Sequence, residues 1–267
     1  MFMERNFSFR KSLGQNFLRD KNVIHKIVDS ANIDKDTLVV EIGPGGGAIT
    51  EKIVPLCGKA MLYEADTRLE NHLNELLSEY HNYSLIIDDF LKRDLCEDLK
   101  EYNFSKIYVV ANLPYYITTP IIMKFIDENV LPDRIVIMIQ KEVAERFCAD
   151  VGSREYGSLT VFLKYYYHIK KLFDVSRNCF FPKPNVDSTV VMMDLKKDRL
   201  KICDIDFFKL LVKDSFSMKR KNIRNNLKKY DLSVVEDVLG RYGFDLSVRA
   251  EQLSLDVFVE LANRLVR

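Results

Sequence analysis

The sequence predicts an α/β fold, in which a parallel β-sheet is covered by helices on both faces and is followed by a small all-α region. Continuous apolar segments of strand length alternate with helix-like segments, which is typical of a buried parallel sheet. After Lys196 no strand-like run remains, and apolar residues recur at helical spacing. We therefore expect a sheet domain at residues 1–197, with a basic N-terminal segment at 1–26, and a helical domain at 198–267.

The expected elements follow one another as strand, helix and strand. The expected strands are short apolar runs at residues 38–42, 60–63, 83–87, 107–111, 134–140, 159–171 and 186–195. The helices between them are expected at residues 48–54, in a charged segment that runs through Glu79, and at residues 142–147. A short Pro-containing segment joins the last two strands, which suits an antiparallel hairpin at the edge of the sheet.

The charge of the chain is nearly balanced but unevenly distributed. The 267 residues are 47% hydrophobic, enough for a sizeable core, and the net charge is +1. Residues 64–101 hold eleven acidic residues against four basic ones, whereas residues 196–230 hold twelve Lys or Arg against four Asp. This distribution excludes a global basic field and predicts a polarised surface that a polyanion can use.

The cysteines and histidines do not indicate a metal site. The five cysteines lie far apart without a CxxC pair, and the four histidines do not cluster. We therefore expect neither a metal nor a disulfide framework. Reduced thiols are typical of the cytoplasm, and we see no signal-peptide-like segment and no run approaching about 18 apolar residues. We expect a cytoplasmic protein with no membrane partner.

A glycine-rich loop predicts a ligand site. Gly43-Pro44-Gly45-Gly46-Gly47 follows an expected strand and precedes a helix, where glycines permit a sharp turn and close approach to a ligand. Glu64 ends the second strand, 21 residues after Gly43, and Asp89 ends the third. A carboxylate at this distance can bind ribose hydroxyls, so an adenosine-containing cofactor fits. The alternatives are a tight turn without a ligand and two ordinary solvated acids.

A second motif, Asn112-Leu113-Pro114-Tyr115, ends the fourth strand. The Asn112 side-chain oxygen and the carbonyl of Leu113 or Pro114 are acceptors for both N–H groups of an exocyclic amine such as adenine N6. Proline fixes the local backbone, and Tyr115 can stack on the base. Such a site works by positioning and needs no strong general base. The alternative is a strand-ending turn with a packed tyrosine; together with the glycine loop, the motif indicates methyl transfer to a nucleic-acid amine.

Four motifs together resemble one family. They are KSLGQNFL from Lys11, EIGPGGG from Glu41, NLPY from Asn112, and FFPKPNVDS from Phe180. In this order they resemble the KsgA-type rRNA adenine N6,N6-dimethyltransferases. The resemblance implies a Rossmann-like S-adenosylmethionine-dependent methyltransferase sheet with a small all-α C-terminal domain that binds RNA.

The resemblance also implies roles for single residues. The residues implied in S-adenosylmethionine binding are Asn16, Leu18, Gly43, Gly45, Glu64, Asp89 and Asn112. The residues implied in holding the target adenine are Asn112, Pro114 and Tyr115, with Phe180 stacking on its other face. The implied substrate is a pair of adjacent adenosines in the 3′-terminal hairpin loop of 16S rRNA, within assembling 30S particles, and we expect a monomer. Three residues depart from the family pattern, namely Asp88, Phe90 and Tyr116.

Two other functions remain open. The erythromycin-resistance methyltransferases, which act on 23S rRNA, share similar motifs, and a non-catalytic RNA-binding assembly factor could retain the fold. The C-terminal region favours the first family, because Lys219 to Leu227 resembles its basic RRKTLRNNL pattern. The expected RNA-binding residues are Arg220, Lys221, Arg224 and Lys228. Arg220, Arg224 and Lys228 recur every four residues, which predicts a basic stripe on a helix at 219–229, with Ile223 and Leu227 facing inward. The alternative is a basic helix face that contacts only solvent.

Overall fold

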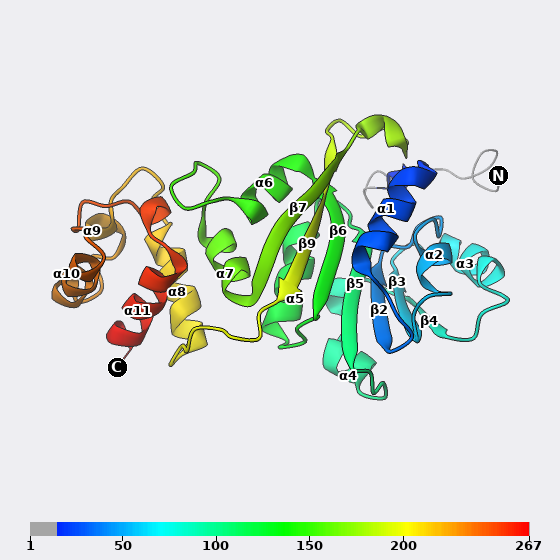
Figure 1. Ribbon diagram of the computed structural model, residues 1–267, viewed down its shortest axis with the longest axis horizontal. Helices are drawn as coiled ribbons and strands as arrows, with labels where there is room; N and C mark the ends of the chain where they lie inside the picture. Colours follow the sequence, from blue (N-terminus) through cyan, green and yellow to red (C-terminus); the bar gives the residue numbers. More distant parts are fainter. Residues whose placement is uncertain (1–14, 267) are drawn as a thin grey trace. The chain divides into compact units, whose positions relative to one another are not determined.

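The computed structural model describes residues 15–266 (Figure 1). The chain divides into two compact units, one holding residues up to 144 together with 170–195, the other holding 145–169 together with 196–267. The contacts therefore group residues 145–169 with the C-terminal helices. The boundary expected between residues 197 and 198, taken as a boundary between folding domains, stays a prediction. Lys11 to Gly14 of the KSLGQNFL motif lie outside the described residues.

A seven-stranded sheet forms the first unit, in the order β4-β3-β2-β5-β6-β9-β7. Strands β2 to β6 pair in parallel, and β9 runs antiparallel to β6. The strands are β2 (Thr37–Ile42), β3 (Lys59–Glu64), β4 (Tyr83–Ile87), β5 (Lys106–Asn112), β6 (Arg134–Gln140), β7 (Tyr167–Val175) and β9 (Ser188–Leu195). The strand order reverses on either side of β2, which in such sheets opens a crevice at the carboxyl ends of the strands.

Helices complete the first unit around the sheet (Figure 1). They are α1 (Lys21–Ala31), α2 (Thr50–Ile53), η3 (Thr67–Leu69), α3 (Glu70–Leu76), η4 (Phe90–Lys92), α4 (Leu95–Leu99), α5 (Thr118–Asp127) and η5 (Arg177–Cys179). Helix α6 (Lys141–Cys148) begins in the first unit, and its residues from 145 onward belong to the second. The side chain of Asp20 caps α1 by accepting from the N–H groups of Asn22 and Val23, at 2.9 and 3.2 Å. The apolar stripe of α1 is buried against β5 and β6, so this helix closes one face of the sheet.

Two short strands far apart in sequence form a separate ribbon. Strand β1 (Phe17–Leu18) pairs antiparallel with β8 (Phe180–Phe181), with Phe17 opposite Phe181 and Leu18 opposite Phe180. The backbone N–H of Arg19 extends the ribbon by donating to the carbonyl of Cys179 at 2.9 Å. This ribbon ties the N-terminal segment to the loop that precedes β9.

The strand expected at residues 159–171 is wrong in its first half. Residues Ser158–Tyr166 form helix α7, and the strand β7 begins at Tyr167. Aromatic and β-branched residues fill this segment and favour a strand. Burial of Val161, Leu163 and Tyr165, together with the contacts of α7 with α8 and α11, stabilises the helix instead. The other expected strands are confirmed to within two residues at each end, and β7 and β9 are neighbours at the edge of the sheet.

Helices build the remainder of the second unit. They are α8 (Ile205–Ser215), α9 (Ile223–Asn226), α10 (Leu232–Arg241), η6 (Ala250–Gln252) and α11 (Leu255–Leu265). Phe216 packs against both Tyr156 and Phe258, with ring centroids 6.1 and 5.7 Å apart. No strand occurs in residues 196–266, as expected.

Two kinds of feature are absent from the part of the chain that the structure describes. Within residues 15–266, no group of three or more His, Cys, Asp or Glu side chains is arranged to hold a metal ion. None of the helices in the same residues has the length and apolar character needed to cross a bilayer.

Candidate active site

A cavity of about 1040 Å³ opens in the first unit at the carboxyl ends of four neighbouring strands. The last residues of β2, β3, β4 and β5 all line it, namely Ile42, Glu64, Ile87 and Asn112. This is the edge at which parallel α/β sheets bind ligands. Every residue expected to bind the cofactor lines the cavity, and so do Pro114 and Tyr115. The structure therefore brings the two predicted motifs to one site.

The glycine loop is shaped for close contact. Gly45 has a φ of +58°, a left-handed conformation that favours glycine. A β-carbon added there would lie 2.8 Å from a ring carbon of Phe17, so the ring of the N-terminal segment closes over the loop. The N–H of Gly45 donates to Glu64 Oε2 at 2.9 Å. Any larger residue at position 45 would displace Phe17 and strain the loop.

Glu64 braces the loop from the next strand. Its Oε1 accepts from the N–H of Asp66 at 2.8 Å, while Oε2 holds Gly45. The side chain is 6% exposed, and burial raises the pKa of this carboxyl group, although the backbone donors oppose the shift. An ionised carboxylate has about four acceptor sites, so acceptor capacity remains for ligand hydroxyls.

Two residues that sequence reasoning missed support this wall. The buried carboxylate of Asp66 accepts from Gln15 Nε2 at 2.7 Å and from Arg68 Nε at 2.8 Å. The Arg68 guanidinium is the main cause that lowers the pKa of Asp66 to about 2, so this carboxylate stays ionised. Gln15 thereby joins the KSLGQNFL motif to the end of β3. The position of Asp66, two residues after Glu64, was the available signal.

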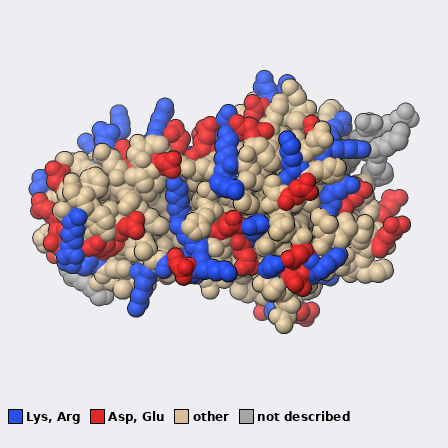
Figure 2. All heavy atoms as spheres, in the orientation of Figure 1, with Lys and Arg blue, Asp and Glu red and all other residues tan. Residues whose placement is uncertain are grey.

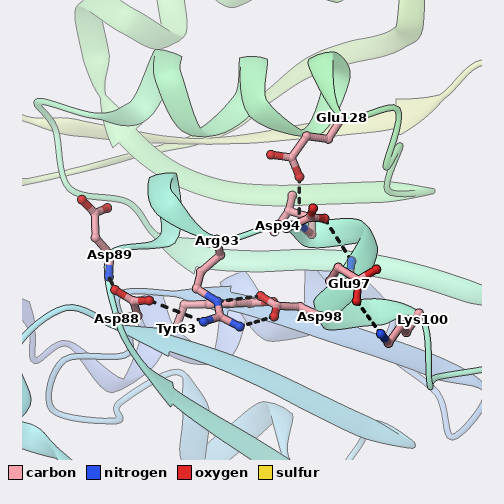
Figure 3. A network of polar contacts seen from close by, with 10 residues as sticks. Tyr63, Asp88, Asp89, Arg93, Asp94, Glu97, Asp98, Lys100 and Glu128 are labelled. Carbon is pink, nitrogen blue, oxygen red and sulfur yellow. Dashed lines mark hydrogen bonds and ion pairs between the residues drawn. The ribbon is translucent and has the colours of Figure 1, made fainter.

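Asp89 follows β4 and is positioned by a network that includes Asp88 (Figure 3). Asp88 Oδ1 accepts the N–H of Asp89 at 2.8 Å, and Asp88 Oδ2 lies 3.5 Å from Arg93 Nη1. Arg93 is also paired with Asp98, which accepts from Tyr63 Oη at 3.1 Å. In Figure 3 the Asp89 carboxylate points away from the Arg93–Asp98 pair. The departure at Asp88 thus stabilises the strand end that presents Asp89.

Glu41 carries an unsatisfied oxygen at the inner wall of the cavity. The side chain is 2% exposed and lines the cavity, and within residues 15–266 its Oε2 has no hydrogen-bond partner. Burial, together with the nearby Glu64 carboxylate, raises the pKa of Glu41 to about 8, against the effect of Thr50. A buried carboxyl oxygen without a partner carries a cost that a hydrogen-bonding ligand would remove.

Asn112 and its neighbours present two acceptors. Asn112 Nδ2 donates to the carbonyl of Asn16 at 3.2 Å, and no residue in 15–266 donates to Asn112 Oδ1. The carbonyl of Pro114 accepts from Ile117 N and Thr118 Oγ1, both at 3.2 Å. The carbonyl of Leu113 has no donor within the described chain. Of the two carbonyls considered from the sequence, Leu113 is therefore the one available to an incoming amine.

The aromatic residues are arranged differently from the expectation. Tyr115 lines the cavity, and its hydroxyl lies 2.6 Å from Ser188 Oγ of β9, which fixes the ring from its far end. Phe180 is 5% exposed and belongs to the hydrophobic core, so it does not line this cavity. Its neighbour Phe181 does line the cavity. Successive residues of a strand point to opposite faces, so one aromatic of the pair enters the core and the other reaches the rim.

The basic stripe expected on one helix is wrong as drawn. Helix α9 covers only Ile223–Asn226, and Arg220 and Lys221 lie in the turn before it. Asn222 caps the start of α9, because its side chain accepts the N–H of Asn225 at 3.2 Å, and such a cap competes with continuation of the helix toward the N-terminus. Ile223 and Leu227 are fully buried, as expected.

The basic side chains are nevertheless exposed together. Arg220, Lys221, Arg224 and Lys228 are all exposed and form no ion pair within residues 15–266. The buried Asn226 fixes the preceding turn, because Oδ1 accepts from Met218 N at 3.2 Å and Nδ2 donates to Ser215 O at 2.6 Å. Elsewhere, on the face in Figure 2, basic and acidic side chains are interspersed.

The comparison with protein families decides the class of this chain. The profile described as "Ribosomal RNA adenine dimethylase" matches residues 6–266. The chain belongs to the ribosomal RNA adenine dimethylase family. It is 43% identical to "Ribosomal RNA small subunit methyltransferase A" of Anoxybacillus flavithermus, over 97% of this chain and 91% of that protein. The protein of the same name from Staphylococcus haemolyticus is 42% identical, over 96% and 89%.

Solved structures agree with the family. A dimethyladenosine transferase from Plasmodium falciparum matches with a TM-score of 0.76 at 28% identity, covering 92% of this chain and 95% of its own. The 23S rRNA methyltransferase ErmE matches with a TM-score of 0.74 at 26% identity, covering 93% and 99%. The dimethylase family consists of S-adenosylmethionine-dependent rRNA methyltransferases, and this chain is one of them. Its Rossmann-like sheet with a helical C-terminal part is the fold that the sequence predicted.

The cavity fits S-adenosylmethionine. This cofactor combines a ribose, an adenine with donor groups, and positively charged ammonium and sulfonium groups. The cavity offers the carboxylate of Glu64, the carboxylate of Asp89 and the unpartnered Glu41 Oε2 to such a ligand. An acidic, acceptor-rich wall suits a cationic nucleoside.

Proposed function

We propose that this protein dimethylates N6 of two adjacent adenosines in the 3′-terminal hairpin loop of 16S rRNA, within the 30S subunit or its precursor. The names of the small-subunit relatives support this substrate. One observation supports the chemistry: Asn112 Oδ1 and the Leu113 carbonyl are two acceptors without donors among the described residues. They lie next to Tyr115 and in the same cavity as Glu64. We place the protein in the cytoplasm as a monomer that acts in small-subunit biogenesis.

The residues that would hold the cofactor come from successive strand ends. Glu64 is suited to the ribose hydroxyls and Asp89 to the exocyclic amine of the adenine, while Gly43 and Gly45 allow close backbone contact. Asn16 and Leu18 close the same cavity from the N-terminal segment. When bound, S-adenosylmethionine supplies the methyl group.

The chain itself makes the adenine amine reactive by positioning it. The lone pair of an exocyclic amine is delocalised into the ring, and acceptors on both N–H groups favour its release from conjugation. Asn112 Oδ1 and the Leu113 carbonyl take these two places, with Pro114 fixing the backbone between the strand and Tyr115. Tyr115 stacks on the base, and Ser188 holds its hydroxyl. Phe180, which the family resemblance assigns to the other face of the adenine, is buried beside the cavity.

Arg220, Lys221, Arg224 and Lys228 bind rRNA phosphates in this proposal. They are exposed and lack acidic partners within the described chain. Arg220 and Lys221 lie in the turn that Asn226 holds in place, Arg224 lies in α9, and Lys228 follows that helix. Phosphate contacts of this kind supply affinity and orientation, while the cavity selects the base.

Methyl transfer to defined particles tests the proposal. Labelled S-adenosylmethionine is incubated with the full chain and with immature 30S particles that lack the modification. We expect incorporation of up to four methyl groups per particle, mapped to two adjacent adenosines, and none with particles that already carry them. Transfer to 23S rRNA instead would mean that this protein acts on the same rRNA as its structural relative ErmE, a 23S rRNA methyltransferase. Binding of particles without any transfer would favour a non-catalytic assembly factor.

A further inference from the structure

Phe181 is an aromatic side chain that the proposed chemistry leaves without a role. It lines the cavity, yet 45% of it is exposed to solvent. Phe181 also lies next to Phe180, which is buried, so the strand presents this ring outward.

A cation accompanies the ring. The guanidinium carbon of Arg19 lies 4.2 Å from the centroid of Phe181, a cation–π contact. Arg19 is exposed and lines the same cavity. Lys21 and Lys92 line it as well, so three cations surround a cavity whose inner wall is acidic.

The β1–β8 ribbon and the loop after it hold this pair in place. Phe181 pairs with Phe17 across the ribbon, and the N–H of Arg19 donates to Cys179 O. In the loop after β8, Asp187 accepts the N–H of Arg177 at 2.9 Å, and Arg177 Nη1 donates to Asn185 O at 3.1 Å. The ring and the guanidinium are thus set before any ligand arrives, which lowers the entropy lost on binding.

We propose that Phe181 and Arg19 form a stacking subsite for the nucleotide next to the target adenosine. The base of that nucleotide stacks on Phe181, and the adjacent phosphate meets Arg19. This inference rests on the proposed function, because it assigns a second contact to the same RNA.

The chemistry of the pair fits single-stranded RNA. Grooves that bind single strands combine cations that follow the backbone with aromatic rings on which bases stack, and any base has a face to offer. A target base withdrawn into a cavity leaves its neighbour unstacked on that side, and an exposed ring at the rim replaces the lost stacking. Phe181 is at the rim, whereas Tyr115 is further in and half-buried.

A matched pair elsewhere in the unit provides the control. Lys26 lies over the ring of Phe173, with its Nζ 5.8 Å from the centroid. Neither residue lines the cavity. Phe173→Leu therefore removes an aromatic ring beside a cation without touching the proposed subsite.

The experiment measures transfer by wild type, Phe181→Leu, Phe181→Trp and Phe173→Leu. The substrates are 30S particles reconstituted with 16S rRNA whose 3′ segment is synthetic. One substrate has both adenosines, and two others have an abasic nucleotide on the 5′ or the 3′ side of the measured adenosine. With the intact substrate, Phe181→Leu should raise the KM for particles by about 5- to 150-fold, while kcat and the affinity for S-adenosylmethionine change little. Phe181→Trp and Phe173→Leu should behave like wild type.

The abasic substrates give the decisive comparison. If Phe181 stacks on a neighbouring base, one abasic substrate raises the KM of the wild type, and the Phe181→Leu variant then shows no further loss on it. Equal KM values for wild type and Phe181→Leu on the intact substrate overturn the subsite. So does an undiminished Phe181→Leu effect on both abasic substrates, because it assigns the loss to the fold of the ribbon. A wild-type protein that transfers no methyl group to intact particles overturns the proposed function itself.

Discussion

The side chains that line the cavity of the first unit are fixed by partners, whereas those of the basic surface of the second unit are not. The basic surface consists of Arg220, Lys221, Arg224 and Lys228. In the cavity, Glu64 and Tyr115 are each fixed by a partner, namely the N–H of Gly45 and the hydroxyl of Ser188. On the basic surface, Arg220 and Arg224 are exposed and have no acidic partner in the described chain. Chemistry requires groups held in one geometry, whereas phosphate contacts need only charge in the right place.

The difference extends to what is buried. The inner wall of the cavity includes Glu41, whose Oε2 lacks a partner. Beneath the basic turn lies Asn226, whose amide is satisfied at both ends. In the first unit the buried Glu41 leaves an oxygen unsatisfied at the cavity, whereas in the second unit the buried Asn226 is fully hydrogen-bonded and shapes a turn. In the proposed function, the first unit would contribute pre-organised groups and the second unit exposed charges.

The largest effect should come from breaking the fixed geometry of the cavity. Asn112→Ala removes one of two acceptors for the adenine amine, and we expect kcat to fall by about 10²- to 10³-fold, as for loss of one oriented hydrogen-bonding group. Single-turnover methyl transfer to 30S particles measures the change. Asn74→Ala is the control, because Asn74 is exposed, lies outside the cavity lining, and its side chain accepts from Tyr83 Oη at 3.2 Å. Turnover within tenfold of wild type, in a folded Asn112→Ala protein, would show that Asn112 does not act on the amine.

An intermediate effect should come from the basic surface. The double variant Arg220→Ala and Arg224→Ala should weaken binding to 30S particles and make the slope of log K against log salt shallower by about 1.4 to 1.8, because two phosphate contacts are lost. Filter binding between about 50 and 200 mM salt measures the slope, because affinity from phosphate contacts falls strongly over this range.

The same unit contains a matched control for the two arginines. Arg241 and Arg264 both pair with Asp237, at 2.9 and 3.0 Å. Replacing both by Ala should leave the salt slope near that of wild type. Equal slopes for the two double variants would mean that Arg220 and Arg224 face only solvent.

The smallest effect concerns stability and the buried Glu41. Its pKa of about 8 in the folded protein lies above the ordinary value of 4.5, because burial disfavours the charged form. The folded state therefore holds the proton more tightly, and stability falls as pH rises from about 4.5 to about 8. We expect Glu41→Gln to be more stable than wild type at pH 9 by at least about 1 kcal/mol, the equivalent of roughly one pKa unit.

Urea unfolding at pH 5 and pH 9 measures this difference. At pH 5 both side chains are neutral, and the two proteins should differ little. Glu51→Gln, at an exposed position of α2, controls for the loss of a surface charge. A stability difference between wild type and Glu41→Gln that is the same at both pH values would contradict a raised pKa.

The sequence was sufficient for the sheet and for the residues at its strand ends. Apolar runs bounded by Gly or polar residues located most strands, because a strand buried on both faces leaves a continuous hydrophobic signal. Gly43, Glu64, Asp89 and Asn112 were found because each follows or ends such a run. Chain order alone places them at one edge of a parallel sheet.

Contacts between distant segments and short polar motifs were not predictable in this way. Strands β1 and β8 have two residues each, too short for any periodicity, and their pairing is set by tertiary packing. The same pairing decides which of Phe180 and Phe181 is buried. At Ser158–Tyr166, packing of the helix against its neighbours outweighed the strand propensity of the residues. The spacing of basic residues by four had suggested a long helix, but the Asn222 cap makes α9 begin only at Ile223.

The ribbon between β1 and β8 also has a consequence for biosynthesis. Phe17 and Leu18 belong to the wall of the cavity, but their strand partners are made only when synthesis has reached Phe181. At roughly 5 to 20 residues per second, several seconds or more separate the two halves of this wall. A nascent chain therefore emerges with its first strands and its glycine loop long before the pocket is complete.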